Sequence, residues 1–184
     1  MKNILKNRLA LSTVVTTLII LVVSVLLAGV VTYFAINVTS TRVQEESLAL
    51  TKQHVWFNSS GTPATQAALL IINTGGRDVV LDKISVRGQQ VTWANVLYGV
   101  TSSSISDDLE CNTTAAAGPY SIGTVHFTLA AASDDLTLQS GNSMVLFISS
   151  PDSITINDIG LTVAITAFTS QAMYYKECNV QAIT

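Results

Sequence analysis

The stretch that decides the fold is RLALSTVVTTLIILVVSVLLAGVVTYFAINVTSTR, which runs from Arg8 to Arg42. Between these two arginines lie 33 residues without a charged side chain. As an α-helix, such a run would measure about 50 Å at ~1.5 Å per residue. A helix of about 20 apolar residues is enough to cross a bilayer. We therefore expect a long N-terminal helix, of which Leu11 to about Phe34 is apolar enough to span a membrane.

Three interpretations of this run stay open from its residues alone. It is a discarded secretory signal, a retained membrane anchor, or the packing helix of something assembled outside the cell. A secretory signal has an apolar region of about 7–15 residues, and this run is roughly twice as long. Its final third is also more polar, with Thr32, Tyr33 and Asn37 among its residues. This favours a helix that continues beyond lipid into water or protein.

The charges are distributed unevenly along the chain. Lys2, Lys6 and Arg8 crowd the first eight positions, with no acidic residue among them. A basic N-terminus beside an apolar span stays on the cytoplasmic side of a membrane. From Leu11 onward there are six basic and twelve acidic residues, a formal net charge of −6. An acidic, lysine-poor body excludes nucleic-acid binding through phosphate contacts.

The remainder of the chain carries strand signals. ATQAALLIINTGGRDVVLDKISVRG (residues 64–88) reads as a strand, a Gly-containing turn and a second strand. Alternation or apolar runs predict further strands over 124–131, 144–148, 161–167 and 172–180. About seven short strands at roughly ten-residue spacing are typical of an all-β sandwich. The stretch from 99 to 123 is expected to be an irregular loop.

These patterns predict an α+β fold class, with a long N-terminal hydrophobic α-helix followed by an all-β, immunoglobulin-like β-sandwich domain. The expected organisation is a basic leader peptide over 1–10, a helix over 11–52 and an extracellular β-sandwich over 53–184. In the second segment, Glu45, Glu46 and Lys52 between apolar residues indicate a weakly amphipathic helix end.

The two cysteines, Cys111 and Cys178, are 67 positions apart and belong to no CxxC motif. A zinc site needs about four ligands at characteristic spacing, and the sequence offers no such set. If this part of the chain is extracellular, one disulfide closing a long loop is the natural expectation. The alternative is two unrelated buried thiols.

Three Asn-x-Ser/Thr sequons occur, at Asn37, Asn58 and Asn112. Such sequons are acceptors for N-glycosylation when they lie in surface loops of extracellular domains. Asn58 and Asn112 are expected in loops, and Asn37 is expected within the helix. All three are therefore possible glycosylation sites, with Asn37 the least suited of them.

No pattern in the sequence indicates an enzyme. The only histidines, His54 and His126, have no second ligand at metal-like spacing. The acidic clusters at 107–110 and 134–135 would suit calcium, but a solvated loop is the favoured interpretation. No serine lies in a nucleophile-elbow or SxxK setting. We expect no catalytic residue, no metal and no cofactor.

RLALSTVVTTLII and LLIINTGGRDVVLDKISVRG, together with the layout of leader, helix and sandwich, resemble archaeal type IV pilin-like proteins. This superfamily includes adhesion pilins and archaellins. The second motif is similar to the early β-hairpin of that superfamily, in which a strand ends in Asn-Thr-Gly. The resemblance implies a structural subunit of an extracellular, pilus-like filament that serves surface adhesion.

The resemblance also implies processing by a membrane-bound prepilin peptidase on the cytoplasmic side. Carried onto this chain, the expected leader-processing residues are Arg8, Ala10 and Leu11, with cleavage between the last two. The family usually places its charged residue directly before the small one, whereas Leu9 intervenes here. The helix would first hold the precursor in the cell membrane, and the assembly machinery would then move it into the filament.

In such a homopolymer, identical helices bundle in the core and the β-domains lie outside. Small and hydroxylated residues let helices approach closely in an apolar medium. The expected filament-core residues are Val15, Leu18, Leu21, Val22, Val25, Gly29 and Val30.

The alternative is a single-span surface protein that keeps its leader and displays a β-sandwich for binding. Two further options within the superfamily are an archaellin and a minor pilin. The Gly-Leu-Asp-like mature start that archaellins often show is missing here, which ranks that option lower.

Overall fold

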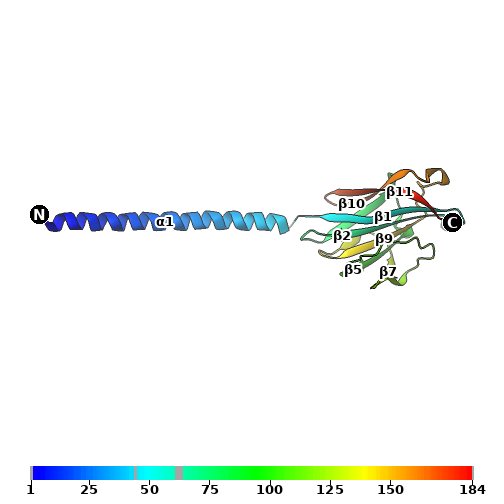
Figure 1. The fold of residues 1–184 in the computed structure, drawn as a ribbon, viewed down its shortest axis with the longest axis horizontal. Coiled ribbons are helices and arrows are strands. Elements are labelled where there is room, and N and C mark those ends of the chain that lie inside the picture. The colour runs from blue at the N-terminus through cyan, green and yellow to red at the C-terminus, as the bar shows by residue number, and fades with distance from the viewer. Residues whose placement is uncertain (1, 44, 61–63, 184) are drawn as a thin grey trace. The chain divides into compact units, whose positions relative to one another are not determined.

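The computed structural model describes residues 2–43, 45–60 and 64–183, with side chains described from 11 to 41 in the first range. The chain divides into two compact units, residues 1–43 and 44–184, each described by itself. The first unit is a single helix, α1 (Lys2–Val43). The second unit, hereafter the β-domain, is built of strands (Figure 1).

Within the described residues, the β-domain has eleven strands and two short 3-10 helices. In chain order these are β1 (Leu48–Asn58), β2 (Thr65–Asn73), β3 (Val79–Val86), β4 (Gln89–Gln90), η1 (Trp93–Asn95), β5 (Val96–Thr101), β6 (Gly118–Ile122), β7 (Val125–Ala131), β8 (Leu136–Leu138), β9 (Ser143–Ser149), η2 (Ile156–Asp158), β10 (Thr162–Thr169) and β11 (Met173–Ile183). The expected α+β class, a long apolar helix followed by a β-sandwich, is confirmed.

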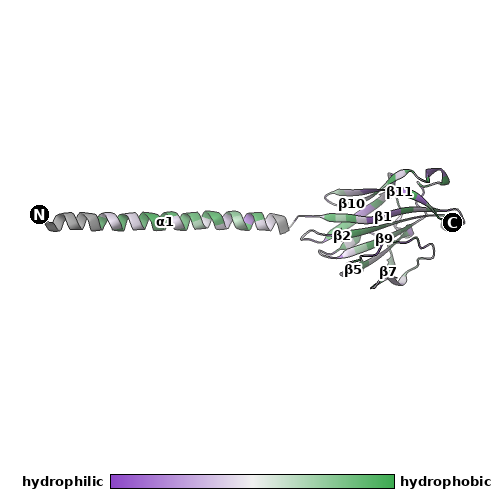
Figure 2. Cartoon of the chain, in the orientation of Figure 1, coloured by the Kyte–Doolittle hydropathy of each residue, from purple (hydrophilic) through white to green (hydrophobic). Residues whose placement is uncertain are grey.

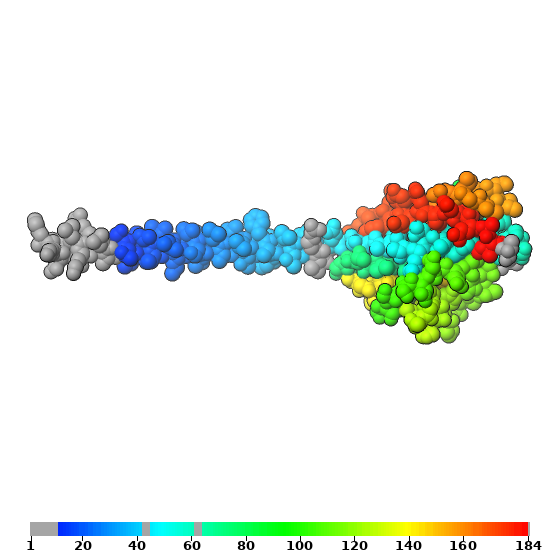
Figure 3. Space-filling model, in the orientation of Figure 1, coloured from blue at the N-terminus to red at the C-terminus, as the bar shows by residue number. Residues whose placement is uncertain are grey.

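The strands form a continuous hydrogen-bonded path in the order β4-β3-β10-β11-β1-β2-β9-β5-β7-β6, with β8 paired to β3. The path bends at β11, which pairs antiparallel with β10 up to Asn179 and parallel with β1 from Val180 onward. One strand thereby belongs to both layers of the sandwich. In Figure 3, β10–β11 (orange to red) and the segment around β6 and β7 (green) lie on opposite sides of β1 (cyan).

The central strands β2 and β9 are buried on both faces. In β2, Leu69 faces a cluster shared with β3 and β10, whereas Leu70 faces a second cluster shared with β7 and the 102–117 loop. In β9, Leu146 and Phe147 divide between the same two clusters. This explains the continuous apolar runs in both strands, because a strand covered on both faces has no polar side. Each fully buried side chain of this size stabilises the fold by about 1.5–3 kcal/mol.

A β-bulge in β1 sets which side chains face each cluster. The β1–β2 register shifts between Thr51 and His54, and Lys52 has a φ of 53°. Before the bulge, Leu50 faces the cluster shared with β3 and β10; after it, Val55 takes that side. Trp56 consequently faces the second cluster. An inserted residue of this kind reverses the alternation of the strand that follows it.

The expected helix over 11–52 is wrong at its C-terminal end. The helix ends at Val43, and β1 already begins at Leu48. Leu48 and Leu50 are buried in the core, and Leu48 pairs with Asn73 of β2. Pairing and burial override the weak helical pattern that the charged residues indicated. The boundary of the β-domain therefore lies before residue 48, not at 53.

The stretch expected to be an irregular loop over 99–123 contains the end of β5 and all of β6. At Gly99, an added Cβ would clash with the ring of Phe127, so the aromatic ring occupies the space beside this glycine. The ring of Tyr120 packs edge-on against Phe127 and Phe147. The β6–β7 hairpin thereby folds over the outer face of β5 and β9.

The Asn-Thr-Gly turn after β2 is held by a buried asparagine. Asn73 is 1% exposed, and its amide nitrogen donates to the carbonyl oxygens of Arg77 and Leu138, at 2.8 and 3.1 Å. Its Oδ1 accepts from the backbone N–H of Gly75 at 3.0 Å. The Asn73 side chain thus supplies hydrogen-bond partners to backbone groups on both sides of the turn. Only an amide offers both the donor and the acceptor that these bonds need, which explains the asparagine at this position.

The same turn holds the segment that leads from the helix into β1. Ser47 O accepts from the backbone N–H groups of Thr74 and Gly75, at 2.9 and 3.0 Å. From the other side, the Thr169 hydroxyl donates to Glu46 Oε1 at 2.5 Å, and the Tyr174 hydroxyl donates to Glu46 O at 3.4 Å. Residues 45–47 are therefore hydrogen-bonded on one side to the β2–β3 turn and on the other side to β10 and β11.

We expect Gly75→Ala to destabilise the β-domain by about 1–3 kcal/mol, the usual cost of forcing an extra methyl into a packed site. A Cβ at Gly75 would lie 2.6 Å from Glu45 O and 2.7 Å from Ser47 N, and backbone atoms cannot move aside cheaply. Urea unfolding of the full chain in detergent, followed by tryptophan fluorescence, measures the change. Gly29→Ala is the matched control, since a Cβ there meets nothing within 4 Å; equal stability of the two variants would contradict the prediction.

Candidate functional site

The first candidate is the surface of α1. Leu11–Thr41 is a 31-residue span that is long and apolar enough to cross a membrane, and none of its most apolar window is buried in this chain. Every large apolar side chain from Leu11 to Val38 is at least 45% exposed. Figure 2 shows hydrophobic colouring along this helix. A helix that is apolar all round needs lipid or other protein around it.

Five of the hydroxyl groups of α1 are satisfied within the helix. Several serine and threonine side chains donate to a backbone carbonyl three or four residues earlier, at 2.7–2.9 Å. These donors are Thr16, Thr17, Ser24, Thr32 and Thr41. Such back-bonding removes the cost of placing a hydroxyl in an apolar medium. The polar interruptions of the run are therefore compatible with lipid and with a dry protein core alike.

The seven expected filament-core residues all lie on α1, and the structure gives them no partner within the described chain. At about 100° per residue, they fall within about 180° of the helix circumference. The side chains of Val22 and Leu21, two of these seven residues, are 45% and 63% exposed. At Gly29 the surface is notched, because no other atom lies within 4 Å of where a Cβ would sit.

The expected leader-processing residues lie in the first turns of α1. The backbone is helical from Lys2 through this region. The side chains of Arg8 and Ala10 fall outside the described residues, and Leu11 is exposed. Processing between Ala10 and Leu11 stays a prediction from the sequence.

The predicted disulfide between Cys111 and Cys178 is wrong for this structure, in which both thiols are free. Cys111 packs against the cluster that contains Phe147, and Cys178 packs against the cluster that contains Leu146. These clusters lie on opposite faces of the central strands, so the two sulfur atoms are separated by a layer of sheet. Burial raises the pKa of both thiols, that of Cys178 to about 11.

The three sequons occupy different settings. Asn58 is the last residue of β1, and its Oδ1 accepts from the backbone N–H of Ser60 at 2.9 Å. In the 102–117 loop, Asn112 Oδ1 accepts from both the backbone N–H and the hydroxyl of Thr114, at 3.1 and 2.9 Å. Asn37 lies inside the apolar span of α1. Glycosylation of any of them stays a prediction.

Three side chains fasten the 102–117 loop to β1 and β2. Lys52 Nζ donates to Ser106 O at 2.7 Å, and His54 Nε2 lies 3.0 Å from Asp108 Oδ1. The buried Gln66 exchanges two hydrogen bonds of 2.7 Å with the backbone of Asn112. No sequence pattern predicts these contacts, because they join residues about 50 positions apart.

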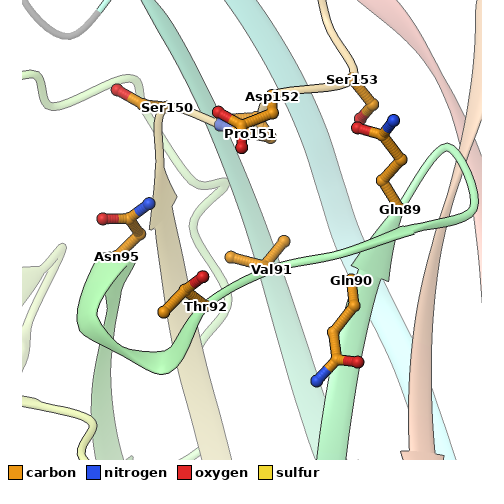
Figure 4. Close-up of a pocket in the computed structure, with 9 residues that line it drawn as sticks. All are labelled: Gln89, Gln90, Val91, Thr92, Asn95, Ser150, Pro151, Asp152 and Ser153. Atoms are coloured by element: carbon orange, nitrogen blue, oxygen red, sulfur yellow. The ribbon is translucent and has the colours of Figure 1, made fainter.

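A small polar pocket lies between the β4–η1 segment and the turn that follows β9 (Figure 4). Its volume is about 20 Å³. The residues that line it are Gln89, Gln90, Val91, Thr92, Asn95, Ser150, Pro151, Asp152 and Ser153. Sequence reasoning missed this site, because its residues come from two segments that are more than 50 positions apart and share no motif.

The turn that forms one wall of this pocket is braced by an ion pair between an exposed arginine and a buried carboxylate. Arg87 Nη1 lies 2.7 Å from Asp158 Oδ1, and the Asp158 side chain is 7% exposed. Asp158 Oδ2 also accepts from the backbone N–H and hydroxyl of Thr155, both at 2.8 Å. These bonds from Thr155, followed by the charge and hydrogen bond of Arg87, lower the pKa of the Asp158 carboxyl.

Among residues 2–43, 45–60 and 64–183, no group of three or more His, Cys, Asp or Glu side chains is placed to hold a metal ion. His54 Nε2 lies 3.0 Å from Asp108 Oδ1, and the His54 ring stacks on Trp56 with ring centroids 5.1 Å apart. The expectation that the chain is not an enzyme stays a prediction.

No protein-family profile matches this chain, and no curated protein matches it. Among solved structures, it is similar to the ligand-binding region of serine-glutamate repeat protein A of Enterococcus faecium, with 12% identity over 76% of this chain and 98% of that one, at a TM-score of 0.32.

A second similar chain comes from a structure described as manganese lipoxygenase of Gaeumannomyces graminis with part of zonadhesin of Komagataella pastoris. It matches at 12% identity over 74% of this chain and 45% of its own length, with a TM-score of 0.25. At these TM-scores, neither similarity carries an argument about function.

Both cysteines should be reduced and poorly reactive in the folded protein. A thiol whose pKa is raised is almost fully protonated at pH 8, and the thiolate is the reactive form. Iodoacetamide at pH 8 should label Cys178 slowly in the native chain and both residues quickly in urea, as counted by intact mass. A chain that takes up no label in urea until a reductant is added would show that the disulfide exists.

We expect Asp158 to make stability fall at acidic pH. Its native pKa is lowered, so the carboxylate stabilises the fold above the ordinary value of about 3.9 and this contribution is lost as pH falls through the native pKa. In Asp158→Asn, urea unfolding between pH 3 and 7 should therefore show lower stability at neutral pH and a shallower acid-side slope. Asp82→Asn, which removes an exposed carboxylate from β3, is the control; a variant at Asp158 with an unchanged slope would contradict the prediction.

Proposed function

We propose that this chain is the structural subunit of an extracellular filament of the archaeal type IV pilus kind, polymerising through α1 and serving surface adhesion. The observation that carries the proposal is the apolar surface of α1. Leu11–Thr41 is 31 residues long, about 47 Å at ~1.5 Å per residue, whereas the hydrocarbon core of a bilayer is about 30 Å thick. A bundle of identical helices accommodates this whole length, whereas an untilted helix in a bilayer leaves about a third of it outside the hydrocarbon core.

The internal hydrogen bonding of α1 supports this proposal. A helix that leaves lipid for a dry protein core must have no unsatisfied polar group in either setting. The hydroxyls of Thr16 and Ser24, both within the apolar span, are satisfied by their own helix in both cases. The apolar surface that prefers lipid also buries favourably against copies of itself.

The charge of the β-domain is consistent with an outer position in such a filament. Residues 45–184 contain twelve acidic and five basic residues, a formal net charge of −7. Like-charged domains in such a layer repel one another at low ionic strength. At 0.1 M salt, this repulsion is largely screened between charges more than about 10 Å apart. In this proposal the precursor resides in the cell membrane, prepilin peptidase removes the leader, and assembly machinery moves the subunit to the cell surface.

A second candidate is a single-span surface protein that stays in the membrane. It is favoured by the same satisfied hydroxyls and the all-round apolar surface of α1, which suit lipid without any partner helix. It differs in its outcome, because its leader remains attached and the protein is a monomer in detergent. Archaellin and minor pilin are variants of the first proposal and differ from it in the abundance and role of the subunit.

Val23→Asp should abolish filaments and leave the β-domain folded. The substitution places an unpaired carboxylate at the middle of the apolar span, which costs several kcal/mol in a dry core. Filaments sheared from cells and counted by electron microscopy measure assembly, and urea unfolding measures the fold. Val80→Asp adds the same charge at a valine of β3 that is 39% exposed, and it should assemble normally.

Mass spectrometry of the N-terminal peptide from the sheared material separates the two candidates. A mature start at Leu11 is expected for the filament subunit. An intact leader containing Arg8 in surface material, or normal filaments from Val23→Asp, would overturn the filament proposal.

A further inference from the structure

The polar pocket of Figure 4 lies at the end of the sandwich where β1 finishes, opposite the end at which the chain enters it. Ser149, directly before the pocket turn, pairs with Gln66 of β2, which in turn pairs with Trp56 near the end of β1. The chain enters β1 at Leu48, at the other end of the same strand. The pocket and residues 45–47 therefore lie at opposite ends of β1.

The pocket has an apolar floor and a polar rim. Val91 and Pro151 are buried, and the residues around them are more exposed. Figure 4 shows Thr92 and Asn95 on one side of Val91 and Ser150 across from them. Within the described part of the chain, the side chains of Gln89, Thr92 and Asn95 make no hydrogen bond. Their donors and acceptors remain available to a ligand.

The walls of the pocket are held in place by bonds that do not use its rim. The Ser153 hydroxyl donates to Val86 O at 2.8 Å, and Arg87 Nη1 donates to Ser153 O at 3.2 Å. Ser150 adopts a φ of 49°, a left-handed conformation that is uncommon for serine. Its backbone N–H donates to Thr65 O at 2.9 Å. The backbone of the pocket walls is therefore fixed before a ligand binds, and only the side chains of the rim lose conformational freedom on binding.

The chemistry of the rim selects a neutral ligand that is rich in hydroxyl groups. Amides and hydroxyls each offer both donors and acceptors, as sugar hydroxyls do. Asp152 is the single carboxylate, and it accepts hydrogen bonds but repels anions. Arg87, which contacts Ser153, is already paired with Asp158. The volume of about 20 Å³ exceeds the ~10–15 Å³ that one water molecule needs, so one hydroxyl fits inside.

We propose that this pocket is a carbohydrate-binding site, in which one hydroxyl of a neutral polysaccharide enters between Asn95 and Ser150 and the sugar ring lies across the rim. Gln89, Thr92 and Asp152 then bind neighbouring hydroxyls of the same sugar. The inference deepens the proposed adhesive function and rests on it, because it names the class of surface that the β-domain would bind.

The test measures binding of the full chain in detergent to immobilised neutral polysaccharides, with dextran, mannan and cellulose as probes. The Gln89→Ala, Asn95→Ala double variant should bind roughly tenfold more weakly, since the hydrogen bonds of two side chains to the sugar are lost. Gln171→Ala removes a comparable amide at an exposed residue of the β10–β11 turn, and it should bind like the original chain. Urea unfolding of each variant checks that the fold is retained.

Absence of binding by the original chain to all three probes would overturn the inference, as would equal binding by the double variant. Assembly is scored separately by electron microscopy. Filaments without polysaccharide binding would sink this inference alone. Binding that depends on Gln89 and Asn95 in a chain that never forms filaments would sink the filament proposal alone.

Discussion

Two-sided burial of β2 and β9 is the constraint on which the rest of the β-domain depends. A strand with Leu69 on one face and Leu70 on the other must be covered twice. The chain supplies one cover as the β3–β10 layer and the other as the β6–β7 hairpin with the 102–117 loop. The Ser/Thr-rich loop is therefore not a loose connection, because Ile105 and Leu109 within it complete the second cluster.

The helix α1 has the opposite arrangement. Its side chains are largely apolar, yet within the described chain nothing covers them, and several of its hydroxyls are satisfied by its own backbone. The β-domain thus buries its apolar side chains within its own fold. The apolar side chains of α1 are buried only if lipid or another protein surrounds the helix. This contrast is the physical basis for treating α1 as the part of the chain that meets lipid or other copies.

Local pattern was enough to predict much of the fold. The two strands predicted on either side of the Gly-containing turn within residues 64–88 are β2 and β3. Three features were not predictable, because long-range contacts decide them. Leu48–Thr51 becomes strand by pairing with β2, Cys111 and Cys178 face different clusters, and the polar pocket joins residues from two distant segments. A single sequence does not show which distant segments of the chain contact one another in the fold.

The parallel pairing of β1 with the end of β11 has a consequence for biogenesis. Val55 cannot take its place beside Val180 until nearly the whole β-domain has been synthesised. Long-range pairings of this kind form late, because the entropy of closing the chain must be lost before the contact contributes. During synthesis the sandwich therefore lacks the strand that joins its two layers. If α1 resides in a membrane as proposed, a β-domain that is not yet closed can still be threaded across that membrane, and the fold closes on the far side.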